Sequence, residues 1–158
     1  MPDTLPVGNK APDFTLKDTN GKDFTLSNQT AQKNVVLLFF PLAFSSVCSE
    51  EFCQVRDNLK IYEKLNASVV GVSVDSFFTL NEFRKAHNLN VTLVSDFNKE
   101  ISQAFGALYD DFFGMRGVAK RAAFVIDQNR IIRYDEVLED SGNVPDFAKI
   151  QSTLSQLG

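Results

Sequence analysis

The sequence contains few of the residues from which proteins build metal sites or disulfide frameworks. It has two cysteines and one histidine in 158 residues, and no tryptophan. A four-ligand zinc site needs more Cys and His than this, and His87, near a predicted helix end, is interpreted as a solvated or capping residue. Two nearby cysteines also make a poor structural framework in the cytosol, where thiols stay reduced. We therefore predict no metal, and reactive cysteine chemistry remains.

Clusters of positive charge and long apolar runs are missing as well. The chain has 16 Lys and Arg against 20 Asp and Glu, a net charge of −4, without the basic clusters that bind phosphate backbones. No apolar run approaches the roughly 18 residues that span a bilayer, and residues 1–6 show no charged or apolar region of an export signal. We expect a cytoplasmic protein with no nucleic-acid or membrane partner.

What is present fits one globular domain. The hydrophobic fraction of 44% and the charged fraction of 23% are typical of soluble domains, and 158 residues is near the length of one domain. No repeat, low-complexity tract or linker divides the chain. We predict a single domain over residues 1–158, and we expect most of its 15 phenylalanines in the core.

Apolar patterning predicts strands that alternate with helices. Residues 13–16 and 23–26 flank Asn20-Gly21 and predict a hairpin, and the apolar run 35–40 predicts a central buried strand. Helical spacing predicts one long helix from 46 to about 65. Further strands are expected at 68–74, 92–94, 121–127 and 131–134, and helices at 80–86, 99–105 and 145–157. The order predicts an α/β protein whose mixed central sheet is flanked by helices, a thioredoxin-like fold with an N-terminal β-hairpin extension.

The segment from Phe40 to Cys53 carries the strongest chemical signal. A buried strand leads into a tight loop, and Cys48 follows in the first turn of the next helix. Unpaired backbone N–H groups and the helix dipole favour an anion there, so the sequence predicts a stabilised Cys48 thiolate. Ser45 or Ser46 is expected to cap this helix.

Cys53 lies five residues after Cys48. In a straight helix the two side chains would point about 140° apart, with Cα atoms roughly 8.6 Å apart. A disulfide reaches only to roughly 7 Å, so a bond between them requires the start of the helix to unwind. The spacing leaves two interpretations of Cys53 open, a partner for Cys48 and a buried small hydrophobe.

The pattern Pro41-x-x-x-Ser45-x-x-Cys48 resembles the peroxiredoxin active-site pattern Pro-x-x-x-Thr/Ser-x-x-Cys, with the less usual serine. Further similar segments follow in the same order at 8–14, 72–76, 93–96 and 121–127. The chain resembles peroxiredoxins over nearly its whole length, above all the bacterioferritin-comigratory (Q-type) group and the alkyl-hydroperoxide-reductase E type.

This resemblance implies a thiol-dependent peroxidase that needs no cofactor. Cys48 would attack hydrogen peroxide or an organic hydroperoxide and become a sulfenic acid. Cys53 stands where the Q-type group has its resolving cysteine, so it would close an intramolecular disulfide with Cys48. A thioredoxin- or glutaredoxin-type reductant would then restore both thiols.

The resemblance also assigns roles around the sulfur. Ser45 would hold the peroxide, and Arg121 would lower the thiolate pKa and stabilise charge on the oxygens. Glu51 would orient Arg121, the backbone N–H groups of Val47 and Cys48 would complete the site, and Pro41 would shield it. The residues alone also allow a surface cation at Arg121 and an ordinary helix charge at Glu51.

Two other functions stay open: a single-cysteine peroxidase resolved by an external thiol, and a non-catalytic redox sensor. A general thiol–disulfide exchanger is disfavoured, because it would carry Cys-x-x-Cys at the helix start.

Several phenylalanines fall in loops or at element ends, where the family has a dimer contact. Aromatic residues are enriched in interface cores, so the resemblance implies a homodimer, although each ring singly is expected to pack within the monomer. The rings are Phe44, Phe77, Phe78, Phe112 and Phe113.

Overall fold

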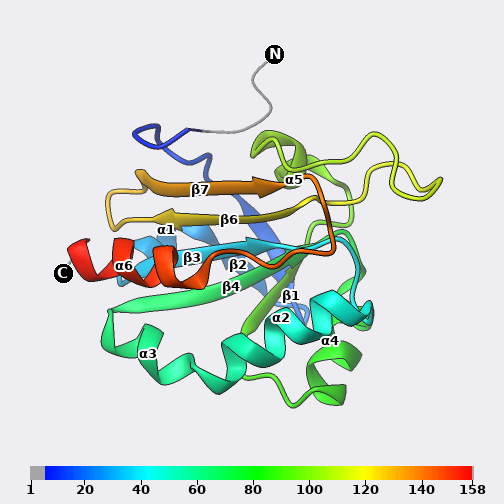
Figure 1. Cartoon of the computed structure of the whole chain (residues 1–158), viewed down its shortest axis with the longest axis horizontal. Coiled ribbons are helices and arrows are strands. Elements are labelled where there is room, and N and C mark those ends of the chain that lie inside the picture. The colour runs from blue at the N-terminus through cyan, green and yellow to red at the C-terminus, as the bar shows by residue number, and fades with distance from the viewer. Residues whose placement is uncertain (1–5, 158) are drawn as a thin grey trace.

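The computed structural model describes residues 6–157. Seven strands form one mixed sheet in the order β2-β1-β5-β4-β3-β6-β7, with helices packed against it (Figure 1). The strands are β1 (Thr15–Asp18), β2 (Asp23–Thr25), β3 (Asn34–Phe39), β4 (Ala67–Ser73), β5 (Thr92–Ser95), β6 (Arg121–Ile126) and β7 (Ile132–Leu138). The helices are α1 (Leu26–Thr30), α2 (Ser46–Asp57), α3 (Leu59–Lys64), α4 (Phe77–Ala86), α5 (Glu100–Ala104) and α6 (Phe147–Leu157).

The centre of the sheet is the apolar strand that the sequence predicted. All six residues of β3 are buried, as expected for a strand covered on both faces. It pairs in parallel with β4 on one side and antiparallel with β6 on the other. Beyond β4, β5 joins in parallel, and the predicted N-terminal hairpin extends the sheet through an antiparallel β1–β5 pair.

Two apolar layers fill the space between the sheet and its helices. On one face Phe52 of α2, Phe83 of α4 and Leu154 of α6 share a cluster with the inward side chains of the sheet, and Figure 1 views this face with α2 and α6 in front. On the other face Phe14 and Phe105 pack over the sheet together with α1. Seven of the 15 phenylalanines are buried, and Phe24 and Phe147 pack partly buried against these clusters. The expectation that most lie in the core therefore holds only when the partly buried rings are counted.

The predicted helix from 46 to 65 is wrong as a single helix. It is broken at Asn58, whose backbone (φ −115°, ψ 15°) leaves the helical region and whose side-chain amide donates to the Gln54 carbonyl at 2.8 Å. Asparagine favours such breaks because its side chain competes for backbone hydrogen bonds. Apolar spacing does not report this break, because α2 and α3 bury residues on the same side of the sheet.

Other element ends moved by a few residues. Helix α4 begins at Phe77 and not at Leu80, because the Ser76 hydroxyl accepts a hydrogen bond from the Thr79 N–H at 3.2 Å and caps the helix. Strand β7 continues past Tyr134 to Leu138 along β6, although its polar residues gave no strand pattern. Helix α6 begins two residues after Pro145.

Candidate active site

The loop after β3 places Cys48 in the first turn of α2. Its side chain is fully buried. Ser45 occupies the N-cap position with an extended backbone, but its hydroxyl donates to the Leu42 carbonyl at 3.0 Å and bonds no helix N–H. The expected side-chain cap by Ser45 is therefore absent, and this hydroxyl does not compete for the amides that face an anion at the helix start.

Arg121 reaches Cys48 from the first position of β6. Its side chain is 1% exposed, and Nη2 donates to the Cys48 sulfur at 3.1 Å. Nη1 donates to Glu51 Oε1 at 2.6 Å, and the Glu51 side chain is itself fully buried. The alternatives of a surface cation and an ordinary helix charge are therefore wrong for Arg121 and Glu51. Three residues that the sequence singled out meet in one buried cluster.

A residue that the sequence did not single out completes the guanidinium contacts. The Ser141 carbonyl, in the segment after β7, accepts from Arg121 Nε at 3.2 Å and from Nη2 at 3.1 Å. The plane of the guanidinium is thus fixed by three groups, the sulfur, the carboxylate and this carbonyl. No side-chain signal marks Ser141, because its backbone makes the contact.

The pKa of Cys48 reflects two opposing effects. Burial raises the pKa of the thiol above its ordinary value, while the charge of Arg121 pulls it down without offsetting the burial. The sequence predicted a lowered pKa, so the net direction corrects that prediction. The reason is complete desolvation of the sulfur, which the position at a helix start does not reveal.

Glu51 competes with Cys48 for the same cation. Burial raises the pKa of Glu51 to about 7, against the attraction of Arg121, and its Oε2 has no hydrogen-bond partner among the described residues. The two acids raise the pKa of Arg121 despite its burial, so the guanidinium stays charged. A single buried cation therefore faces two acidic groups that are both costly to ionise.

A cavity of about 250 Å³ opens beside Arg121. Its wall includes three residues of the loop pattern, Pro41, Ser45 and Val47, so the structure brings them together with the arginine. The remaining wall is partly apolar and comes from Leu42, Ser46, Phe112, Phe113, Ser141 and Gly142.

Asp75, two residues after β4, holds the loop in place. Its Oδ2 accepts from the Ala43 N–H at 2.7 Å and from the Ser73 hydroxyl at 2.7 Å. Burial raises the pKa of Asp75, and these two bonds oppose the rise. Residues 72–76 resembled the family as a segment, and the structure shows that this segment ties the cysteine loop to the sheet.

Cys53 lies apart from this cluster. Both cysteines are free thiols, and Cys53 is half-buried. Its sulfur lies 3.9 Å from His87 Nδ1, and the other ring nitrogen lies 3.2 Å from the Ser49 hydroxyl. His87 is at the C-cap of α4, as the capping interpretation allowed, but its ring is not simply solvated.

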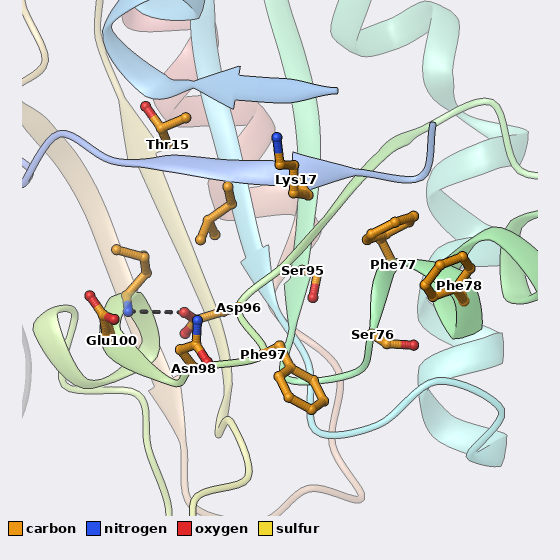
Figure 2. A pocket seen from close by; sticks show the side chains of 12 residues that line it. Thr15, Lys17, Ser76, Phe77, Phe78, Ser95, Asp96, Phe97, Asn98 and Glu100 are labelled. Carbon is orange, nitrogen blue, oxygen red and sulfur yellow. Dashed lines mark hydrogen bonds between the residues drawn. The ribbon is translucent and has the colours of Figure 1, made fainter. Parts of the chain in front are cut away.

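A larger cavity of about 450 Å³ lies elsewhere, between β1, the start of α4 and residues 95–101. Figure 2 shows Phe77 and Phe78 on one side of it and Asp96, Asn98 and Glu100 on the other. No cysteine or histidine lines it, so cavity size alone would not identify the cavity beside Arg121. Residues 6–157 hold no group of three or more metal-binding side chains and no helix suited to crossing a membrane.

A buried cysteine at a helix start, contacted by an arginine from the adjoining sheet, is suited to thiol-based redox chemistry. Residues 7–135 match the AhpC/TSA family. The chain is 40% identical over 146 residues to the chloroplastic 2-Cys peroxiredoxin BAS1 of Spinacia oleracea, covering 85% of this chain and 54% of that protein. It is 38% identical over 144 residues to alkyl hydroperoxide reductase E of Mycobacterium bovis, covering 90% and 91%. The chain therefore belongs to the peroxiredoxin (AhpC/TSA) family.

Solved structures agree with this assignment. Peroxidoxin BcpB from Mycobacterium tuberculosis superposes with a TM-score of 0.88 at 28% identity, covering 98% of this chain and 99% of that one. The thioredoxin-like fold is thereby confirmed. The matched segment spans about half the length of the plant relatives and nearly all of the mycobacterial reductase.

Proposed function

We propose that the protein is a thiol-dependent peroxidase that reduces hydrogen peroxide and organic hydroperoxides, with Cys48 as its nucleophile. One observation carries this proposal: the Arg121 guanidinium lines the cavity and also contacts the Cys48 sulfur at 3.1 Å. A peroxide in the cavity would meet the cation that stabilises the departing oxygen, and the attacking sulfur lies buried directly behind that cation.

The reaction is a displacement at the peroxide O–O bond. The Cys48 thiolate forms an S–O bond as the O–O bond breaks, which gives a sulfenic acid, and the departing oxygen takes a proton and leaves as water or an alcohol. Ser45 already donates to the Leu42 carbonyl, so its oxygen is free to accept from a peroxide O–H. The N–H of Val47 would hold the peroxide, and Pro41 would shield the product.

Ionisation of Cys48 is coupled to occupation of the cavity in this proposal. Desolvation is the larger of the two effects on the pKa of Cys48. A polar peroxide against the sulfur would remove part of that desolvation and leave the attraction of Arg121, so the pKa would fall where the substrate binds. Proton loss from Glu51 acts in the opposite direction.

We further propose that Cys53 resolves the sulfenic acid as an intramolecular disulfide, which a thioredoxin- or glutaredoxin-type reductant then reduces. Partial exposure of Cys53 supports this role, since a pure packing residue would be fully buried. The two cysteines lie in one continuous helix, so residues 46–52 must unwind before they bond. The single-cysteine route with an external thiol remains the competing mechanism.

Intact mass after one equivalent of hydrogen peroxide tests both statements. We expect the wild-type monomer to lose two hydrogens, and Cys53→Ser to keep one added oxygen. Cys48→Ser should consume no peroxide. Full peroxidase turnover by Cys48→Ser would refute the assignment, and a lasting added oxygen in the wild type would favour the single-cysteine route.

The raised pKa of Cys48 favours a second candidate, a non-catalytic redox sensor, because a protonated thiol reacts slowly. The second-order rate of Cys48 with hydrogen peroxide separates the two. A rate no faster than that of an ordinary exposed thiol would support the sensor.

We also propose that residues 1–158 act as one domain and assemble as a homodimer through the predicted aromatic rings. Exposure supports this surface: Phe44 is 52% exposed, Phe78 71% and Phe113 87%. Phe112 packs edge-on against Phe113, and Phe77 stacks on Phe78.

A further inference from the structure

His87 contacts both the first part of α2, at Ser49, and its later part, at Cys53 and Arg56. Its Nε2 lies 3.2 Å from the Ser49 hydroxyl, in the part of the helix that must unwind for a disulfide. Its Nδ1 lies 3.9 Å from the Cys53 sulfur, and its backbone carbonyl accepts from Arg56 Nη1 at 2.6 Å. The contact with Arg56 ties the later part of α2 to the end of α4. This contact would keep Cys53 beside His87 if residues 46–52 unwind.

The two ring contacts are compatible with one tautomer of neutral imidazole. With the proton on Nε2, the ring donates to the Ser49 hydroxyl, and Nδ1 presents a lone pair to the Cys53 thiol. The opposite tautomer would place an N–H against the thiol and leave Nε2 to accept from Ser49. Only the first arrangement allows His87 to take a proton from the sulfur.

We propose that His87 is the general base that deprotonates Cys53 for disulfide formation. The inference rests on the proposed function, and it names a residue that the active-site pattern does not contain. Cys53 gives its proton to His87 Nδ1, and the thiolate attacks the sulfur of the Cys48 sulfenic acid. The S–S bond forms as the S–O bond breaks. The departing hydroxide takes the proton from the imidazolium and leaves as water.

Two aromatic rings and residues of α2 surround His87. The rings of Phe44 and Phe83 pack against it at centroid distances of 6.4 and 5.1 Å. From α2 it meets Ser49, Cys53 and the cation of Arg56.

No carboxylate is recorded in contact with His87 among the described residues. The charged neighbours on its own helix point to other partners, because Arg84 donates to Asn81 and Lys85 pairs with Glu82.

Rapid mixing with one equivalent of hydrogen peroxide, followed by acid quench and intact mass, measures the two steps separately. His87→Asn should form the sulfenic acid at the wild-type rate, because His87 does not contact Cys48. Disulfide formation should slow at least tenfold, within the roughly 10²–10⁴-fold range of general base catalysis. Lys85→Gln, an exposed change on the same helix, should leave both rates unchanged.

The pH profile of the disulfide step distinguishes a base from a packing residue. With a general base, the wild-type rate should reach its plateau at a lower pH than the rate of His87→Asn. In His87→Asn the rate should rise with pH over a wider range, because the thiol must then lose its proton to solvent. His87→Gln provides a second variant with a longer side chain, and thermal unfolding of each variant verifies that it is folded.

The outcomes separate this inference from the function on which it rests. A wild-type disulfide rate and pH profile in both folded His87 variants would overturn the role of His87 and leave the Cys53 resolver intact. A wild-type protein that keeps its added oxygen and forms no disulfide would overturn both the resolving role of Cys53 and the base role of His87. The proposed reaction of Cys48 with peroxide would still stand.

Discussion

At the scale of single residues, one buried cation, Arg121, contacts two acidic groups, Glu51 and the Cys48 thiol. Arg121 contacts Glu51 at 2.6 Å and the sulfur at 3.1 Å. A negative charge on Glu51 weakens the attraction of Arg121 for the Cys48 thiolate. The protonation state of Glu51, whose pKa is raised to about 7, therefore affects the ionisation of the Cys48 thiol near neutral pH.

Glu51→Gln should lower the pKa of Cys48. The amide oxygen can still accept from Arg121 Nη1, but the competing charge is gone, so more of the guanidinium's field acts on the sulfur. We would measure thiolate absorbance against pH in a Cys53→Ser background, so that one thiol titrates. Glu50→Gln, an exposed neighbour, is the control and should leave the pKa unchanged. A higher pKa in Glu51→Gln would contradict shared use of the cation.

The sequence identified the residues whose side chains belong to the active-site pattern. It did not identify residues that contribute through the backbone or through contacts between distant segments. Cys48, Glu51 and Arg121 were predicted, and they meet in the structure. Ser141 contributes a backbone carbonyl, which any residue type provides. His87 meets Cys53 across two helices, and no local pattern encodes a contact between residues 34 positions apart.

At the scale of elements, the sheet was largely predictable because its apolar runs are short and well separated. The break at Asn58 was not, since α2 and α3 continue one apolar face through a residue whose side chain bonds the backbone. The length of β7 was underestimated, because pairing with β6, and not the composition of β7 itself, keeps it extended. Long-range pairing and local side-chain competition are the two effects that single-segment patterns leave out.

Gly71 lets α2 approach the sheet closely, and Gly71→Ala should destabilise the fold. A Cβ there would lie 2.7 Å from Leu93 Cδ2 and 2.8 Å from Phe52 Cε1. Overpacking of this kind costs about 1–3 kcal/mol, to be measured by urea unfolding. Phe52→Leu removes one of the two side chains that crowd the methyl group, so the double variant should lose less than the sum of the two single changes. Additive losses would argue against this contact.

At the scale of the whole molecule, burial of Glu51 should make stability depend on pH. Its pKa rises from 4.5 to about 7 on folding, so between these values the folded state binds more protons than the unfolded state. The contribution of Glu51 to stability therefore falls as pH rises through that window, by up to about 1 kcal/mol per pH unit. Glu51→Gln should lose this slope, and Glu50→Gln should retain it. Unfolding free energies measured from pH 4.5 to 7 test this, and parallel curves for all three proteins would contradict it.

Assembly is the other property of the whole molecule, and the exposed ring of Phe113 provides its test. The ring is 87% exposed and stands at the wall of the cavity beside Arg121, where water contact of so large an apolar surface is unfavourable. We expect the wild type to sediment as a dimer and Phe113→Glu as a monomer, because a buried unpaired charge would oppose the contact. Ile61→Glu, which changes an exposed apolar residue of α3 outside the predicted surface, should remain dimeric. A Phe113→Glu dimer of unchanged affinity would place the contact elsewhere on the molecule. A monomeric wild type would mean that the proposed dimer does not form.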